Sequence, residues 1–163
     1  MNLEMFKEKL LSLKPNLKDL LSEGYSEEGA LQILNNEYIL KPMKIQKKYD
    51  SILLDFLHNY NLEFFSIRNI SFDDILRYVN GYLLVGGFDG GYLGLDENTG
   101  RIYIIYADEI NNISTLFVEN ELQFFEILLI FAEYSSRGSE DEIEKYVERC
   151  ENVCLLGNYD SFF

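Results

Sequence analysis

The sequence predicts a single α+β domain in which helices from both ends of the chain pack on a mainly antiparallel sheet. Apolar residues recur at helical spacing in residues 1–61 and again in residues 118–156. Between them, residues 62–108 are rich in β-branched and aromatic residues separated by turn signals. With 163 residues, 47% of them hydrophobic, the chain is long enough for one core and too short for two.

The N-terminal part is expected to be helical. Leu3, Phe6, Leu10 and Leu13 recur every three or four residues and so form one stripe of a helix. Ser26 is a suitable N-cap for another helix, because acidic residues follow it directly. The clearest stripe has offsets of 0, 3, 4, 7, 8 and 11 and consists of Tyr49, Ile52, Leu53, Phe56, Leu57 and Tyr60.

The sheet is expected to begin at Leu62, with a strand over residues 62–70. Ser71 and Asp74 resemble a capping box, which predicts a short helix that Asn80-Gly81 would end. Three strands follow, with the sequences YLLVGGF, DGGYLGLD and GRIYIIYAD. The turns between them are too short for a crossover, so we expect an antiparallel meander.

Two helices are expected near the end of the sequence. Asn120 can cap a helix that is apolar on almost every side over residues 124–131, so this helix is either buried on several sides or packed against a second subunit. Ser139 and Glu142 form a capping box for the last helix, and Cys150 and Cys154 lie on its apolar stripe.

The composition of the chain excludes some classes of function. The net charge is −14, and the whole acidic excess lies in residues 51–163, which hold 20 acidic and six basic residues. Such a polyanion repels phosphate backbones, so direct nucleic-acid binding is not expected. Two closely spaced Cys, no secretory signal and no apolar run of about 20 residues favour a soluble, cytoplasmic protein in a reducing compartment, away from membranes.

No catalytic motif, metal site or cofactor site is expected. His58 is the only histidine, and the two Cys are too few ligands for a structural zinc. The segment GGFDGG lacks the Lys-Ser/Thr of a phosphate loop, and DENTG lacks the later oxygen ligands of a calcium loop. Turns explain both segments better.

Three segments, in order, resemble the SUKH superfamily, which includes yeast cell-wall synthesis regulators and bacterial immunity proteins. They are FLHNYN at residues 56–61, the hairpin from Leu83 through Tyr103 with LLVGGFDGG and LGLD, and residues 118–125. The resemblance spans roughly residues 45–132. It implies an α+β fold without catalytic residues and, for bacterial members, neutralisation of a co-encoded toxin, often a nuclease, by binding it.

The hypothesis is therefore an immunity-type protein, not an enzyme, that binds a cognate basic toxin through its acidic surface. The candidate partner-binding residues are acidic residues of turns and strand edges, with two tyrosines as anchors: Asp89, Tyr92, Asp96, Glu97, Tyr103, Asp108 and Glu109. One alternative is a regulatory scaffold or homodimer that uses the apolar helix 124–131. Another is a small hydrolase or ligand-binding domain that uses the glycine-rich turn.

Overall fold

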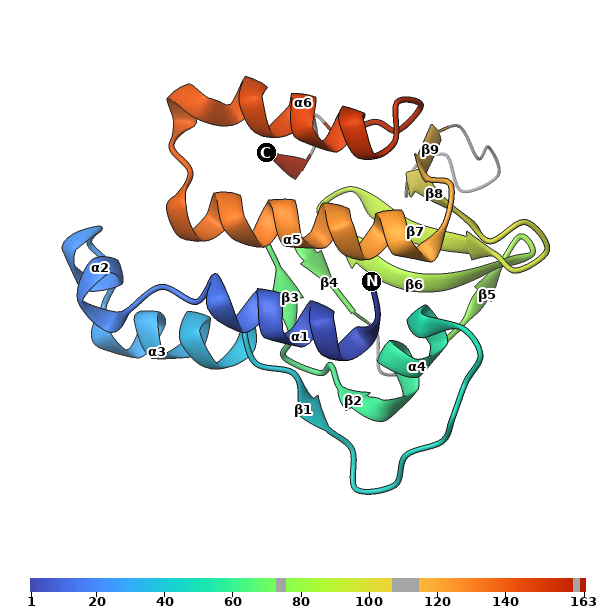
Figure 1. Cartoon of the computed structure of the whole chain (residues 1–163), viewed down its shortest axis with the longest axis horizontal. Helices are drawn as coiled ribbons and strands as arrows, with labels where there is room; N and C mark the ends of the chain where they lie inside the picture. The colour runs from blue at the N-terminus through green and yellow to red at the C-terminus, as the bar shows by residue number, and fades with distance from the viewer. Residues whose placement is uncertain (73–75, 107–114, 160–161) are drawn as a thin grey trace.

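The computed structural model of the chain describes residues 1–72, 76–106, 115–159 and 162–163. It confirms the predicted α+β class, because helices from both ends of the chain surround a mostly antiparallel sheet (Figure 1). The N-terminal elements are α1 Leu3–Ser12, α2 Leu17–Ser22, α3 Glu27–Asn36, β1 Lys41–Pro42, α4 Ile52–Asn59 and β2 Tyr60–Asn61. The helical start that the periodicity predicted is therefore present.

Each of the helices α1 to α4 begins at a side-chain cap. Asn2, Asn16, Ser26 and Ser51 each accept a hydrogen bond from the backbone N–H three residues further on. These bonds satisfy N–H groups that have no partner inside the helix. The predicted cap at Ser26 is confirmed, and so is the stripe of α1, in which Leu3, Phe6 and Leu10 are buried.

The main sheet has seven strands among the described residues, in the order β3-β4-β6-β7-β8-β9, and β5 also pairs with β6. Its strands are β3 Ser66–Ile67, β4 Ile70–Ser71, β5 Tyr78–Val79, β6 Tyr82–Phe88, β7 Gly91–Asp96, β8 Arg101–Tyr106 and β9 Thr115–Val118. The predicted meander is confirmed: β6, β7 and β8 are neighbours, and both pairs are antiparallel.

The C-terminal helix α5, Glu121–Arg137, passes through the core. Asn120 caps it, as predicted, by accepting hydrogen bonds from the N–H groups of Leu122 and Gln123. Between residues 124 and 131 most of its side chains are at most 1% exposed, namely Phe124, Phe125, Ile127, Leu128 and Phe131. The helix is thus buried on several sides within one chain, while Leu129 remains half-buried.

The predicted helix after Ser71 is wrong. Residues 73–75 lie outside the described part, and Tyr78–Val79 form strand β5, which pairs with β6. Asn80 and Gly81 join these strands in a two-residue turn with φ angles of 51° and 86°. Asn-Gly is favoured in such hairpin turns because both residues tolerate positive φ, so the signal marked a hairpin and not a helix end.

Two other expectations are corrected. The strand predicted over residues 62–70 is instead the short hairpin β3–β4, which turns at Arg68, where φ is 57°. The capping box of the last helix does not form, because the Ser139 hydroxyl reaches only the Glu142 carboxylate and α6 starts at Ile143. That helix, α6 Ile143–Val153, follows a 3₁₀ turn at Glu140–Glu142.

The predicted apolar stripe of α6 is confirmed, since Tyr146, Cys150 and Cys154 are all buried. Both cysteines are free thiols, and burial raises the pKa of Cys150 to about 12. A separate small cluster, Leu20, Ala30 and Leu34, joins α2 to α3. Within the described ranges, no helix is both long and apolar enough to cross a bilayer.

Candidate protein-binding surface

The main sheet has an inner and an outer face, because side chains alternate along each strand. In β7, Leu93 and Leu95 belong to the main core, which places Tyr92, Gly94 and Asp96 on the opposite side. The register with β6 and β8 extends this side over both neighbouring strands. We call it the outer sheet face, and it consists of Tyr82, Leu84, Gly87, Tyr92, Gly94, Asp96, Arg101, Tyr103 and Ile105.

A glycine at position 94 shapes the middle of the outer sheet face. Tyr103 lies directly opposite Gly94 in the register, and its ring meets that of Tyr82 at a centroid distance of 5.6 Å and an angle of 78°. A Cβ atom on Gly94 would lie 2.5 Å from Ile105 Cδ1 and 3.0 Å from Tyr82 Cβ. The missing side chain therefore leaves room for Ile105 and Tyr82 to pack across β7.

The tyrosines of the outer sheet face are available for contact. Tyr82, Tyr92 and Tyr103 are all half-buried, and Tyr78 on β5 is 63% exposed. Burial raises the pKa of the Tyr82 hydroxyl, so this group stays protonated at neutral pH. Rings held in this way present a large contact area with an accompanying hydroxyl, a combination that is common at protein interfaces.

Asp96 and Glu97 lie at one end of the outer sheet face. The Asp96 carboxylate accepts hydrogen bonds from the Thr99 hydroxyl at 2.7 Å and the Asn98 N–H at 2.9 Å. These bonds lower the pKa of Asp96 and keep the carboxylate ionised, and the bond from Thr99 has the larger effect. Glu97 accepts a hydrogen bond from the Tyr78 hydroxyl at 2.6 Å, and this bond raises the pKa of Tyr78. Both carboxylates therefore also shape the turn.

The other predicted partner-binding residues do not lie on the outer sheet face as the structure describes it. Asp89 is exposed in the turn between β6 and β7, at the opposite end of β7 from Asp96. A strand of six residues spans about 17 Å, so the two carboxylates are separated by about this distance. Asp108 and Glu109 lie outside the described residues. The structure thus brings Tyr92, Tyr103 and Asp96 to one face, with Glu97 in the adjoining turn, and places Asp89 elsewhere.

A second acidic surface was missed by the sequence reasoning. It lies on α6 and the preceding 3₁₀ turn, and we call it the α6 acidic face: Glu140, Asp141, Glu144, Glu148 and Glu151. All five residues are exposed, and none forms an ion pair with another described residue. The spacing of Glu144, Glu148 and Glu151 at i, i+4 and i+7 is the signal that could have revealed it.

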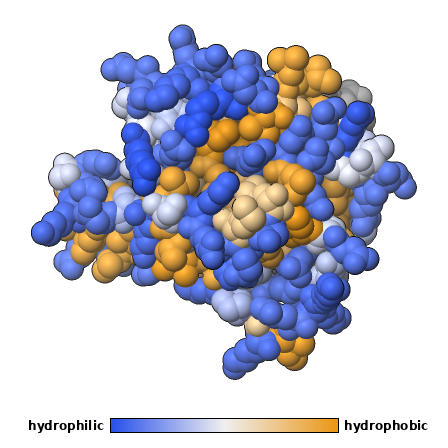
Figure 2. All heavy atoms as spheres, viewed as in Figure 1, coloured by the Kyte–Doolittle hydropathy of each residue, from blue (hydrophilic) through white to orange (hydrophobic). Residues whose placement is uncertain are grey.

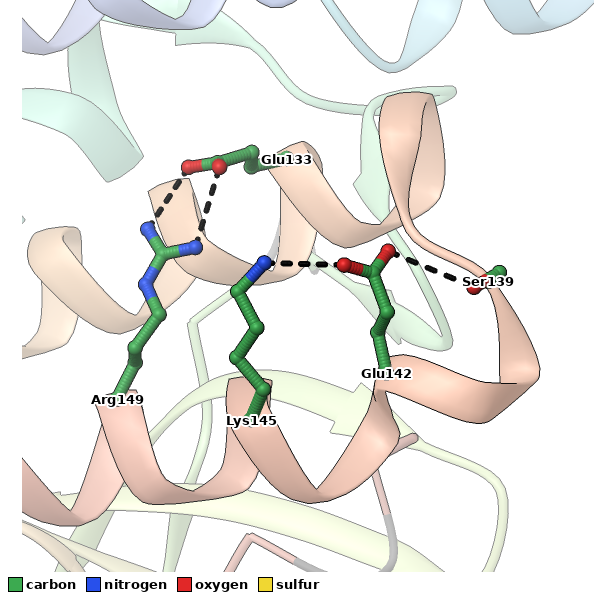
Figure 3. A network of polar contacts seen from close by, with 5 residues as sticks. All are labelled: Glu133, Ser139, Glu142, Lys145 and Arg149. Atoms are coloured by element: carbon green, nitrogen blue, oxygen red, sulfur yellow. Dashed lines mark hydrogen bonds and ion pairs between the residues drawn. The ribbon is translucent and has the colours of Figure 1, made fainter.

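The basic residues of α6 do not neutralise this face. Arg149 donates two hydrogen bonds, of 3.1 Å and 2.8 Å, to the Glu133 carboxylate on α5, and Lys145 pairs with Glu142 at 3.0 Å (Figure 3). Next to the C-terminal end of α6, Leu155 and Leu156 are 82% and 70% exposed. Figure 2 shows a largely hydrophilic surface at the top of the molecule with an apolar patch beside it.

A group of lysines shortly before α4 lies at the other end of the molecule from α6. Lys41, Lys44, Lys47 and Lys48 are all exposed in the segment that projects below the body in Figure 1, whereas α6 lies at its top. The buried Asn59 holds this segment through hydrogen bonds to the backbone N–H and carbonyl of Lys47. Acidic residues lie close to these lysines, with Glu4 and Asp55 beside Lys47 and Lys48 and with Glu27 and Glu28 beside Lys41, so this segment is not uniformly positive.

Among the described residues, no group of three or more His, Cys, Asp or Glu side chains could hold a metal ion. The described residues place tyrosines on the outer sheet face and carboxylates at its margin and on α6. Comparisons with protein-family models, with curated proteins and with solved structures find no match for this chain.

Proposed function

We propose that this protein is an immunity-type binding protein that neutralises a cognate basic toxin, such as a nuclease, by stoichiometric binding. The observation that carries the proposal is the outer sheet face, where Tyr92 and Tyr103 stand on adjacent strands with acidic residues at the end of the sheet. The resemblance to the SUKH superfamily agrees with this function. We expect no bond to be made or broken.

The electrostatics favour a cationic partner. The net charge is −14, and the α6 acidic face contributes five exposed carboxylates. At physiological ionic strength the Debye length is about 8 Å, so a concentrated acidic face attracts a basic protein more effectively than the same charges scattered over the surface. A nuclease needs a cationic cleft for its substrate, and an anionic protein can occupy that cleft.

The tyrosines would supply affinity. Charges at the rim of an interface mainly increase the association rate, whereas a few buried aromatic side chains carry most of the binding free energy. Tyr82, Tyr92 and Tyr103 are held by strand pairing and by the packing over Gly94, so ordering them costs little entropy on binding. A partner docked here would bury these rings.

The test begins with the adjacent reading frame, which should encode a basic toxin-like domain, and mixes that protein with this one. Size-exclusion chromatography and calorimetry of the mixed proteins should show a one-to-one complex, and the neighbour's activity should fall to zero at equimolar ratio. Tyr103→Ala should weaken binding by about 10- to 100-fold. Phe64→Ala is the matched control, because Phe64 is 68% exposed on a loop away from the outer sheet face, and it should change binding less than about twofold.

A second pair of variants tests the charge argument. Replacing Glu144, Glu148 and Glu151 with Gln should slow association by about tenfold at low salt and leave dissociation unchanged. The same number of charges removed at Glu23, Glu27 and Glu28 should have a smaller effect. Proteins that elute separately at micromolar concentration, or equal effects of Tyr103→Ala and Phe64→Ala, would contradict the proposal. A constitutive homodimer without a partner would favour the scaffold function.

A further inference from the structure

A cleft of about 450 Å³ opens beside the turn that carries Asp89. This volume lies at the lower end of the range for small-molecule sites, about 300–1,000 Å³. Five separate parts of the chain meet at it: the α2–α3 hairpin, the β3–β4 turn, the β6–β7 turn, helix α5 through Ser135, and the last residues. Its polar and aromatic lining includes Tyr25, Glu37, Arg68, Asp89, Phe162 and Phe163.

Arg68 is already committed to other contacts. Its Nε donates a hydrogen bond to the carbonyl of Phe162 at 3.3 Å, and one of its terminal nitrogens donates to the carbonyl of Phe163 at 3.0 Å. Its guanidinium also lies over the Tyr134 ring, 4.7 Å from the centroid. The residue adopts a positive φ of 57° to make these contacts. Arg68 therefore fastens the last residues to the sheet.

Glu37 has a single positively charged neighbour among the residues that line the cleft, Arg68. It is the C-cap residue of α3, where the helix dipole disfavours a carboxylate, and burial raises its pKa to about 7 although Arg68 acts in the opposite direction. The other ionisable groups that line the cleft or interact with its neighbours are Tyr25, Tyr38, Glu23 and Asp89. None of these is a second cation.

We propose that the cleft binds a cationic side chain, lysine or arginine, of the basic partner; the identity of this guest rests on the proposed function. Glu37 and Asp89 supply carboxylates on two walls. Tyr25, which is 47% exposed, and the half-buried Phe163 supply aromatic surface for a cation, whereas the Phe162 ring is only 1% exposed. An anionic guest would face both carboxylates, while the hydrogen bonds of Arg68 are used elsewhere.

The proposal gives a defined pH dependence. Glu37 must be ionised to bind the cation, and with a pKa of about 7 it is about one-tenth ionised at pH 6 and about nine-tenths ionised at pH 8. Affinity for a cation should therefore rise about tenfold between these two values. The Glu37→Gln variant, which has no charge to titrate, should show no such rise.

The test uses the full chain and no partner, so its result is independent of whether a toxin binds the outer sheet face. N-acetyl-arginine N-methylamide is titrated into isotope-labelled protein and followed by NMR, with the norleucine analogue as the uncharged control probe. Resonances of the cleft residues should shift with the arginine probe only. Glu37→Gln and Asp89→Asn should each weaken binding by at least about tenfold, and Glu23→Gln by less than about twofold.

Asp89→Asn keeps the experiment decisive if Glu37→Gln disturbs the fold, because Asp89 is exposed in a turn. Cleft resonances that do not move with the arginine probe at about 50 mM and pH 8 would overturn the proposal. Equal shifts with the norleucine probe would overturn it too. Either result leaves the proposed function standing, whereas a protein that binds the probe but no basic neighbour contradicts only the proposed function.

Discussion

Glu121 joins two helices through one carboxylate, and its removal should destabilise the fold measurably. It is the first residue of α5, and its Oε2 accepts hydrogen bonds from the Ser51 hydroxyl at 2.7 Å and the Leu53 N–H at 2.9 Å. Ser51 is in turn the N-cap of α4. A single side chain therefore satisfies donors at the start of α4 and places a negative charge at the positive end of both helices.

The expected loss follows from these contacts. Hydrogen bonds to a charged acceptor contribute about 1.5–3 kcal/mol each when buried, and less where water can replace the acceptor. Because Ser51 and Glu121 are both only half-buried, we expect Glu121→Ala to lower the free energy of unfolding by about 2–3 kcal/mol. For a chain of this size that corresponds to a fall in Tm of about 4–12 °C. Glu121→Gln keeps a neutral acceptor and should lose about half as much.

The assay is urea denaturation followed by circular dichroism, supported by a thermal melt. Glu126→Ala is the matched control, because Glu126 lies on the same helix and is exposed, and it should change stability by less than about 0.5 kcal/mol. If Glu121→Ala were no more destabilising than Glu126→Ala, the carboxylate would not link the helices, and the reasoning from its hydrogen bonds would be wrong.

Three further predictions test other parts of the structure. Burial raises the pKa of Glu37 to about 7, so the folded state binds one more proton than the unfolded state between about pH 4.5 and pH 7. The stability of the protein therefore falls as the pH rises through this range. In urea titrations, Glu37→Gln should be more stable than the parent at pH 8 by about 1–3 kcal/mol and equally stable near pH 4. Gly94→Ala should lower the free energy of unfolding by about 1–2 kcal/mol, because the added Cβ would meet Ile105. Gly87→Ala should leave stability unchanged, because a Cβ there would lie no closer than 3.8 Å to any neighbouring atom. Equal losses of stability in the two variants would argue against close packing around Gly94. Cys150, with its pKa near 12 and a buried thiol, should react with Ellman's reagent only after denaturant is added, and native modification would contradict its burial.

The resemblance to the SUKH superfamily and the acidic composition led to a set of predicted partner-binding residues, and the structure shows how the described ones are arranged. Strand register explains why Tyr92 and Tyr103 share a face, since alternation along β7 and β8 fixes the direction of each side chain. Asp96 accepts a hydrogen bond from Thr99, and Glu97 accepts one from Tyr78, which the residue types alone do not reveal. The α6 acidic face shows that exposed carboxylates also lie on a helix and not only in the turns of the sheet.

Local patterns in the sequence determined most of the secondary structure. Apolar spacing predicted α1, α4, α5 and α6, because a stripe that repeats every three or four residues has to be buried on one side of a helix. Short turns predicted the antiparallel meander, because they leave no length for a crossover. Asn80-Gly81 failed as a helix end because the same residues favour a positive φ in a hairpin, and only the pairing of β5 with β6 decides between the two structures.

Only the tertiary structure decided which distant residues meet. The cleft brings Glu37 and Asp89 together, and Glu121 accepts hydrogen bonds from Ser51 and Leu53 at the start of α4, through contacts between segments far apart in the chain. The charge state of Glu37 likewise depends on burial by other segments, which no local pattern encodes. Sequence periodicity fixes what one segment does with its own neighbours, whereas sites, burial and pKa values arise from the packing of segments against one another.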